Sequence, residues 1–141
     1  MMKIVNPDPM FTDEQIGKIE QHYNAKFVCE TTLKTKGDGW LNAPVAVFYT
    51  EEAHPEGSNW FGLYYNTDGY LMVTDAQSAL EPFDGLMLED GSVFYSRFRW
   101  DYREAAGTMV DGGRDYMRYT PIAGSRVVQL KIVKDQLEVV E

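Results

Sequence analysis

The residues best suited to binding chemistry are arginines, and they are gathered in one part of the chain. All six arginines lie within residues 97–126, whereas all seven lysines lie outside that window. Six arginines against four acidic residues give the window a formal charge of +2, while the remainder, with seven lysines and eighteen acidic residues, carries −11. A guanidinium binds carboxylate or phosphate through two parallel hydrogen bonds and stacks on rings, so the cluster is typical of a site for an anion.

Aromatic residues alternate with these arginines, as they would along strands. Arginine forks could hold phosphates while the rings stack on a base, which predicts a compact nucleotide-like ligand. The candidate ligand-binding residues are Arg97, Arg99, Trp100, Tyr102, Arg103, Asp111, Arg114, Tyr116 and Arg118. The alternative is structural, because the same arginines could pair with acidic residues across neighbouring strands.

Asp111 begins a segment, Asp111-Gly112-Gly113, in which two glycines tolerate positive φ. This segment predicts a tight turn or bulge between two arginine-bearing strands. Asp38, Asp68, Asp84 and Asp90 also precede glycine, and Asp-Gly pairs indicate turns before they indicate catalysis.

Two motifs in the arginine window, SRFRWDY at residues 96–102 and VDGGRDYMR at residues 110–118, resemble a motif pair of small uncharacterised bacteriophage proteins. That pair is a Ser-Arg…Asp-Tyr segment followed by Val-Asp-Gly-Gly-x-x-Tyr-x-Arg. Trp100 stands where a histidine is expected, so the resemblance implies no histidine-dependent role. It implies a phage origin, and with it the cytoplasm of a host cell, more than it implies an activity.

Composition narrows the class of protein. With 141 residues, 44% of them hydrophobic, the chain predicts a single globular domain over residues 1–141. The one cysteine, Cys29, excludes an internal disulfide and fits a reducing cytoplasm. The first residues contain no apolar run like a signal peptide, and no stretch approaches the roughly 18 apolar residues of a membrane span. A net charge of −9 disfavours direct binding to nucleic acid.

The sequence gives little indication of an enzyme active site. The two histidines, His22 and His54, are far apart, and metalloprotease, phosphate-loop and dinucleotide motifs are absent. We therefore predict no catalytic residue, no metal ligand and no cofactor. The abundant carboxylates leave a metal-assisted hydrolase as an alternative.

The clearest predicted element is a helix over residues 13–24. Thr12 and Gln15 can form a capping box, and Phe11 with Ile16 can form a hydrophobic staple. Ile16, Ile19 and Tyr23 recur at helical spacing and should face inward.

Period-two alternation and turn residues predict strands through the rest of the chain. Phe27, Cys29, Thr31 and Leu33 should share one face of a strand that begins at residue 26, and a second strand should follow Pro44. Further strands are predicted at 60–65, 70–74, 86–88, 93–103, 108–110, 114–119, 127–133 and 137–140, with hairpin turns at 66–69 and 89–91 and one helical turn within 75–80. Short turns favour antiparallel pairing, so we expect an α+β fold with an N-terminal helix packed on a mostly antiparallel, curled sheet or partial barrel of about eight or nine strands.

Three functional hypotheses follow. The first is a non-enzymatic phage-type binding protein that neutralises a host defence factor, by sequestering a small nucleotide-like anion at the arginine site. The second is an acidic protein that inhibits a host enzyme by docking on its basic, nucleic-acid-binding surface. The third is the metal-assisted hydrolase, and a homo-oligomer is compatible with all three.

Overall fold

The computed structural model describes residues 4–6, 9–35, 41–52, 58–95 and 126–140. Within them it has one α-helix, one short 3-10 helix and nine strands, so the expected α+β class with mostly antiparallel pairing is confirmed. In chain order the elements are β1 (Ile4–Val5), α1 (Asp13–Tyr23), β2 (Lys26–Thr35), β3 (Leu41–Tyr49), β4 (Trp60–Tyr65), β5 (Leu71–Asp75), η2 (Gln77–Leu80), β6 (Phe83–Met87), β7 (Val93–Phe94), β8 (Arg126–Val133) and β9 (Gln136–Val140).

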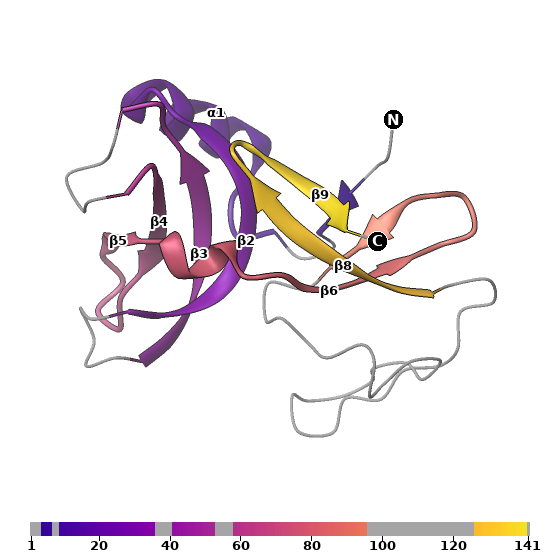
Figure 1. The fold of residues 1–141 in the computed structure, drawn as a ribbon. Helices are drawn as coiled ribbons and strands as arrows, with labels where there is room; N and C mark the ends of the chain where they lie inside the picture. Colours follow the sequence, from indigo (N-terminus) through magenta and orange to yellow (C-terminus); the bar gives the residue numbers. More distant parts are fainter. Residues whose placement is uncertain (1–3, 7–8, 36–40, 53–57, 96–125, 141) are drawn as a thin grey trace.

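The described strands form two sheets (Figure 1). One has four antiparallel strands in the order β2-β3-β4-β5, and the other has five in the order β1-β7-β6-β8-β9. Only β1 pairs in parallel within the described part of the chain, with β7. Strands β2 and β9 each lie at an edge of their sheet, and the two edges approach each other.

Two hydrophobic clusters hold these layers together, and β3 contributes to both. Val45 and Val47 belong to the larger cluster, which fills the space between the two sheets with residues such as Leu130. Ala46 and Phe48, on the other face of β3, belong to the smaller cluster. This alternation is the period-two burial expected of a strand covered on both faces. The smaller cluster is covered by α1, whose apolar stripe packs on the outer face of the four-stranded sheet.

The start of helix α1 confirms the predicted capping box. The Thr12 side chain accepts a hydrogen bond from the Gln15 amide at 3.1 Å, and the Gln15 side chain accepts one from the Thr12 amide at 2.9 Å. Ile16, Ile19 and Tyr23 are half-buried and pack on the smaller cluster as expected. The helix ends one residue earlier than predicted because Asn24 adopts a left-handed conformation, with φ 51° and ψ 53°. It follows β1, so it is not the first element of the chain.

A β-bulge at the start of β2 interrupts the predicted alternation of side chains between the two faces of the strand. Phe27 pairs with Phe48 and Cys29 pairs with Val47, so the register shifts by one residue between them. Phe27 consequently packs in the smaller cluster with α1, whereas Cys29 lies in the larger cluster between the sheets. The prediction that these two side chains share a face was wrong, because an extra residue in one strand reverses its facing.

The prediction of a strand that follows Pro44 was wrong, because the observed strand begins before this proline. Strand β3 starts at Leu41, and Pro44 pairs with Thr32 of β2. Strand β4 pairs only with residues 46–49 of β3, so the missing N–H of Pro44 falls where β3 has a described neighbour on one side alone.

The predicted turns at residues 66–69 and 89–91 are present. Gly69 and Gly91 have φ of 85° and 86°, which an L-residue rarely adopts, and each closes its turn through its amide. Strand β1 was not predicted, and β6 begins three residues before the predicted residue 86. No helix in the described part of the chain is long and apolar enough to cross a membrane.

Candidate functional site

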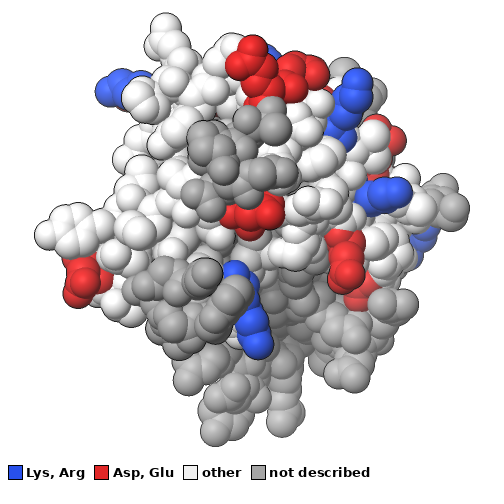
Figure 2. Space-filling model, turned by 60° about the vertical axis from the view of Figure 1, so that its left-hand side comes forward, with Lys and Arg blue, Asp and Glu red and all other residues white. Residues whose placement is uncertain are grey.

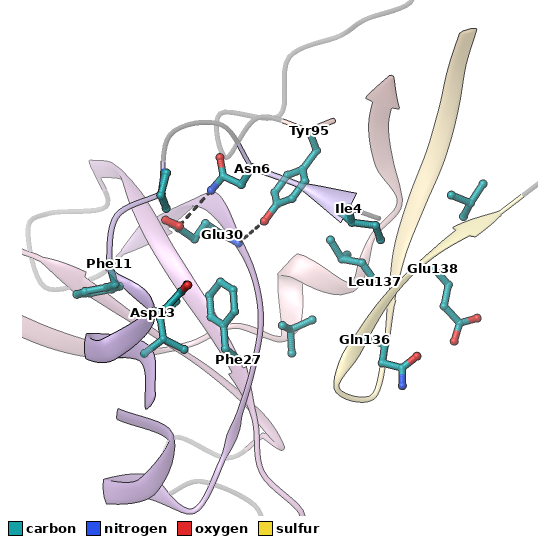
Figure 3. Close-up of a pocket in the computed structure, with 14 residues that line it drawn as sticks. Ile4, Asn6, Phe11, Asp13, Phe27, Glu30, Tyr95, Gln136, Leu137 and Glu138 are labelled. Atoms are coloured by element: carbon teal, nitrogen blue, oxygen red, sulfur yellow. Dashed lines mark hydrogen bonds between the residues drawn. The ribbon is translucent and has the colours of Figure 1, made fainter. Parts of the chain in front are cut away.

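A pocket of about 790 Å³ lies where the N-terminal segment, α1, β2 and β9 meet (Figure 3). Its walls come from five stretches of the chain that are distant in sequence. They are Ile4, Asn6, Pro9 and Phe11 from β1 and the segment after it, Asp13 and Ile16 from α1, Phe27, Val28 and Glu30 from β2, Tyr95 after β7, and residues 136–139 of β9.

Glu30 ties the N-terminal wall of the pocket to β2. Its side chain is only 1% exposed, and both carboxylate oxygens accept hydrogen bonds from the Met10 amide, at 2.9 and 2.8 Å. The side-chain amide of Asn6 donates a further bond to the same carboxylate at 3.1 Å. A buried carboxylate is tolerated only when such donors replace water. Glu30 therefore fixes the path of the chain that brings Pro9 to the pocket.

Tyr95 joins the two sheets beside Glu30. Its ring is 4% exposed and packs near Phe83, with ring centroids 5.9 Å apart. Its hydroxyl accepts a hydrogen bond from the Glu30 amide at 3.2 Å. Burial raises the pKa of Tyr95 well above its ordinary value of 10, and the neighbouring Cys29 and Glu30 raise it further, while the bond from the Glu30 backbone acts in the opposite direction. The hydroxyl therefore keeps its proton and serves as a neutral structural link.

Strand β9 forms the opposite wall. It is joined to β8 by a two-residue turn in which Lys134 has a positive φ of 54°. The Lys134 carbonyl accepts a hydrogen bond from the indole N–H of Trp60 at 2.9 Å, which ties this hairpin to β4. Leu137 and Val139 are half-buried and pack toward the larger cluster, whereas Glu138 is exposed. The β9 wall thus contributes two half-buried apolar side chains and one exposed carboxylate to the pocket.

The charges on the pocket are all of one sign. Its described lining contains three carboxylates, Asp13, Glu30 and Glu138, and no lysine, arginine or histidine. Asp13 and Glu138 are exposed, and Glu138 lies opposite Lys131 of β8 in the hairpin register. By contrast, acidic and basic side chains are interspersed over the face seen in Figure 2, with no single large patch of either sign.

The lining combines apolar side chains with a few polar groups. The Glu30 oxygens are already engaged by the Met10 amide, and the other two carboxylates lie on different elements. Among the described residues there is no group of three or more His, Cys, Asp or Glu side chains that could hold a metal ion. Apolar walls with a few placed polar groups are typical of pockets that bind ligands.

The predicted arginine site lies outside the described residues, and so does its expected turn at Gly112 and Gly113. This applies to every candidate ligand-binding residue, namely Arg97, Arg99, Trp100, Tyr102, Arg103, Asp111, Arg114, Tyr116 and Arg118. Of the six arginines the structure describes Arg126, which is exposed at the start of β8.

Sequence reasoning missed the pocket altogether. Strand alternation places Glu30 on the face opposite Cys29 and Thr31, and no local pattern indicates that Asn6 and Met10 bind its carboxylate. The one available signal was a carboxylate between Cys29 and Thr31 in an otherwise uncharged run of the strand, which is an unusual place for a charge.

Comparison of the chain with protein families, with characterised proteins and with solved structures finds no match.

Proposed function

We propose that this chain is a non-enzymatic binding protein of the phage type, which neutralises a host factor by docking on a basic part of a host protein. The observation that carries the proposal is the pocket, whose described lining is largely apolar and whose only charged residues are acidic. The phage and host setting comes from the motif resemblance, and the cytoplasm of the host cell is the compartment that it implies.

The chemistry of the pocket selects the kind of segment that would bind. Its volume of about 790 Å³ falls within the range of roughly 300 to 1,000 Å³ typical of ligand sites, which is room for several side chains. Apolar side chains would be desolvated against Ile4, Phe27 and Leu137. Lysine or arginine side chains at the border would meet Asp13 and Glu138, which favours association and specificity.

The arginine window supports a second candidate, the sequestration of a small nucleotide-like anion. The supporting observation is compositional, because five of the six arginines lie within residues 97–118 together with Tyr102 and Tyr116. Mononucleotides, dinucleotides and cyclic nucleotides should then raise the melting temperature of the wild-type protein by mass action. Arg114→Ala and Arg118→Ala variants should lose that shift.

Three synthetic peptides test the first candidate against the second. They share length and apolar residues but carry lysine, serine or glutamate at alternate positions. Fluorescence anisotropy should give the tightest binding for the lysine peptide. Its affinity should fall between about 0.1 and 1 M salt, where the screening length drops from roughly 10 to 3 Å.

A matched pair of variants locates the binding. The double variant Asp13→Asn, Glu138→Gln removes two charges from the pocket border, and Glu14→Gln, Glu52→Gln removes two exposed charges that do not line it. Only the first pair of substitutions should lower the affinity for the lysine peptide. Equal affinity for the lysine and glutamate peptides, or no binding of any peptide together with a nucleotide-induced thermal shift, would overturn the first candidate.

A further inference from the structure

Among the strands that the structure describes, β9 forms an open edge of its sheet and one wall of the pocket. Among the described strands β9 pairs only with β8, on one side. Four consecutive residues, 136–139, line the pocket, although successive side chains of a strand point to opposite faces. A cavity that touches both faces in succession must run along the edge itself. The pocket therefore borders the backbone of β9 as well as its side chains.

Antiparallel alternation identifies the backbone groups concerned. Val133 and Gln136 flank the two-residue turn and form the pair that closes the hairpin. Counting from that pair, the N–H and C=O groups of Leu137 and Val139 point away from β8, toward the free edge. These groups would complete a ladder with an extended segment laid beside β9.

Within the described part of the chain, side chains cap two backbone amides of the facing edge, β2, and none caps an amide of β9. The Phe27 amide donates to the Glu20 carboxylate at 2.9 Å, and the Glu30 amide donates to the Tyr95 hydroxyl at 3.2 Å. Side-chain capping of this kind is one way in which a protein blocks unwanted pairing at a sheet edge. The contrast makes β9 the edge at which an added strand meets free backbone groups.

The curl of the five-stranded sheet leaves room beside this edge. Strands β1 and β9 are its two opposite edges, yet Ile4 of β1 lines the same pocket as β9. Figure 3 shows Ile4 near Leu137 at this pocket. A strand added to β9 would extend the five-stranded sheet at this edge.

We propose that the partner binds by β-augmentation, with an extended segment of a host protein pairing with β9 as a sixth strand of this sheet. The proposal rests on the proposed function and names its mode. The segment should alternate apolar and basic residues, because one side of the new strand would face the interior beside Leu137 and Val139. The other side would lie beside the exposed Glu138.

Backbone methylation of the lysine peptide is the direct test on the wild-type protein. N-methyl groups on one alternate set of residues would block the amides that face β9, and the same groups on the other set would not. One methylated set should lower the affinity by at least about tenfold, as the loss of two or more backbone hydrogen bonds predicts. The other set should bind nearly as well as the unmodified peptide.

Two matched pairs of protein variants extend the test. Val139→Pro removes an outward N–H and also changes a half-buried side chain. Val139→Ala removes side-chain volume alone and serves as its control. The proline variant should therefore lose much more affinity for the lysine peptide than the alanine variant. Glu138→Lys should reverse the preference from the lysine peptide to the glutamate peptide. Glu52→Lys, the same charge change away from the pocket, should leave the preference unchanged.

The possible results distinguish a failure of the β-augmentation mode from a failure of the proposed function. Binding of the lysine peptide that is insensitive to both methylated sets would overturn β-augmentation and leave the proposed function standing. No binding of any peptide would overturn both. The protein could instead form a concentration-dependent dimer that Val139→Pro abolishes and that the peptide does not displace. That result would identify a second copy of this chain as the occupant and overturn the choice of a host segment.

Discussion

Glu30 should be the most sensitive polar position in the described structure. The carboxylate is 1% exposed and receives hydrogen bonds from the Met10 amide and the Asn6 side chain, among its partners. Glu30→Gln keeps the shape but leaves one acceptor oxygen in place of two and removes the charge. Hydrogen bonds to charged groups contribute roughly 1.5 to 3 kcal/mol each, so the loss of one should lower the free energy of unfolding by about 2 kcal/mol.

Glu30→Ala should cost more, because both donors lose their partner and a cavity remains. Adding the unsatisfied donors to the lost volume gives about 3 to 5 kcal/mol. Urea unfolding measures both variants, and a lower midpoint at unchanged slope is the expected signature. The matched control is Glu14→Gln, whose carboxylate is 80% exposed and lies 3.5 Å from Lys18. It should change stability by no more than about 0.5 kcal/mol.

Hydrogen exchange adds a local readout for the same variants. The Met10 amide should be protected in the wild type and should exchange faster in Glu30→Gln, since its acceptor is weakened. A Glu30→Gln midpoint equal to that of the wild type, with Met10 still protected, would refute the assignment of Glu30 as the anchor of the N-terminal segment.

Three further predictions concern stability. Thr12→Ala breaks the observed capping box and should cost about 1 kcal/mol in denaturant unfolding, and a cost near zero would contradict the role of the cap. Gly17→Ala should raise stability by about 0.5 to 1 kcal/mol, because a Cβ at this exposed position in α1 meets nothing within 4 Å, and a loss would contradict the helix packing. Because the folded state holds the Tyr95 proton, stability should be full below the unfolded pKa of about 10 and should decline as pH rises from there toward the raised pKa of the folded protein. Tyr95→Phe should flatten that decline, whereas Tyr70→Phe, at a ring that is 70% exposed, should retain it.

Local signals in the sequence were sufficient for the elements whose cause is local. The cap of α1 depends on Thr12 and Gln15, three residues apart, and the turn at Gly69 depends on the residues beside it. Such signals are readable because the atoms that interact are close in the chain. The bulge between Phe27 and Cys29 has no comparable local marker, and it moved one aromatic side chain to the opposite face.

The pocket could not be predicted because its residues meet only through tertiary structure. Glu30 contacts residues 20 and 24 positions earlier and a tyrosine 65 positions later. Those separations are set by how two sheets pack, which depends on the whole core and not on any one stretch. The arginine cluster is conspicuous in composition, yet composition does not specify how side chains are arranged in space.

The most direct test of the account is a nuclear magnetic resonance titration of the wild-type protein with the alternating lysine peptide. Binding at the pocket predicts that the amides of Leu137, Val139 and Phe27 shift, and that the Leu137 and Val139 amides gain protection from exchange as they enter a new ladder. Shifts confined to residues outside the pocket lining, or none at saturating peptide, would contradict the central claim that this acidic, apolar pocket receives a basic segment of a partner protein.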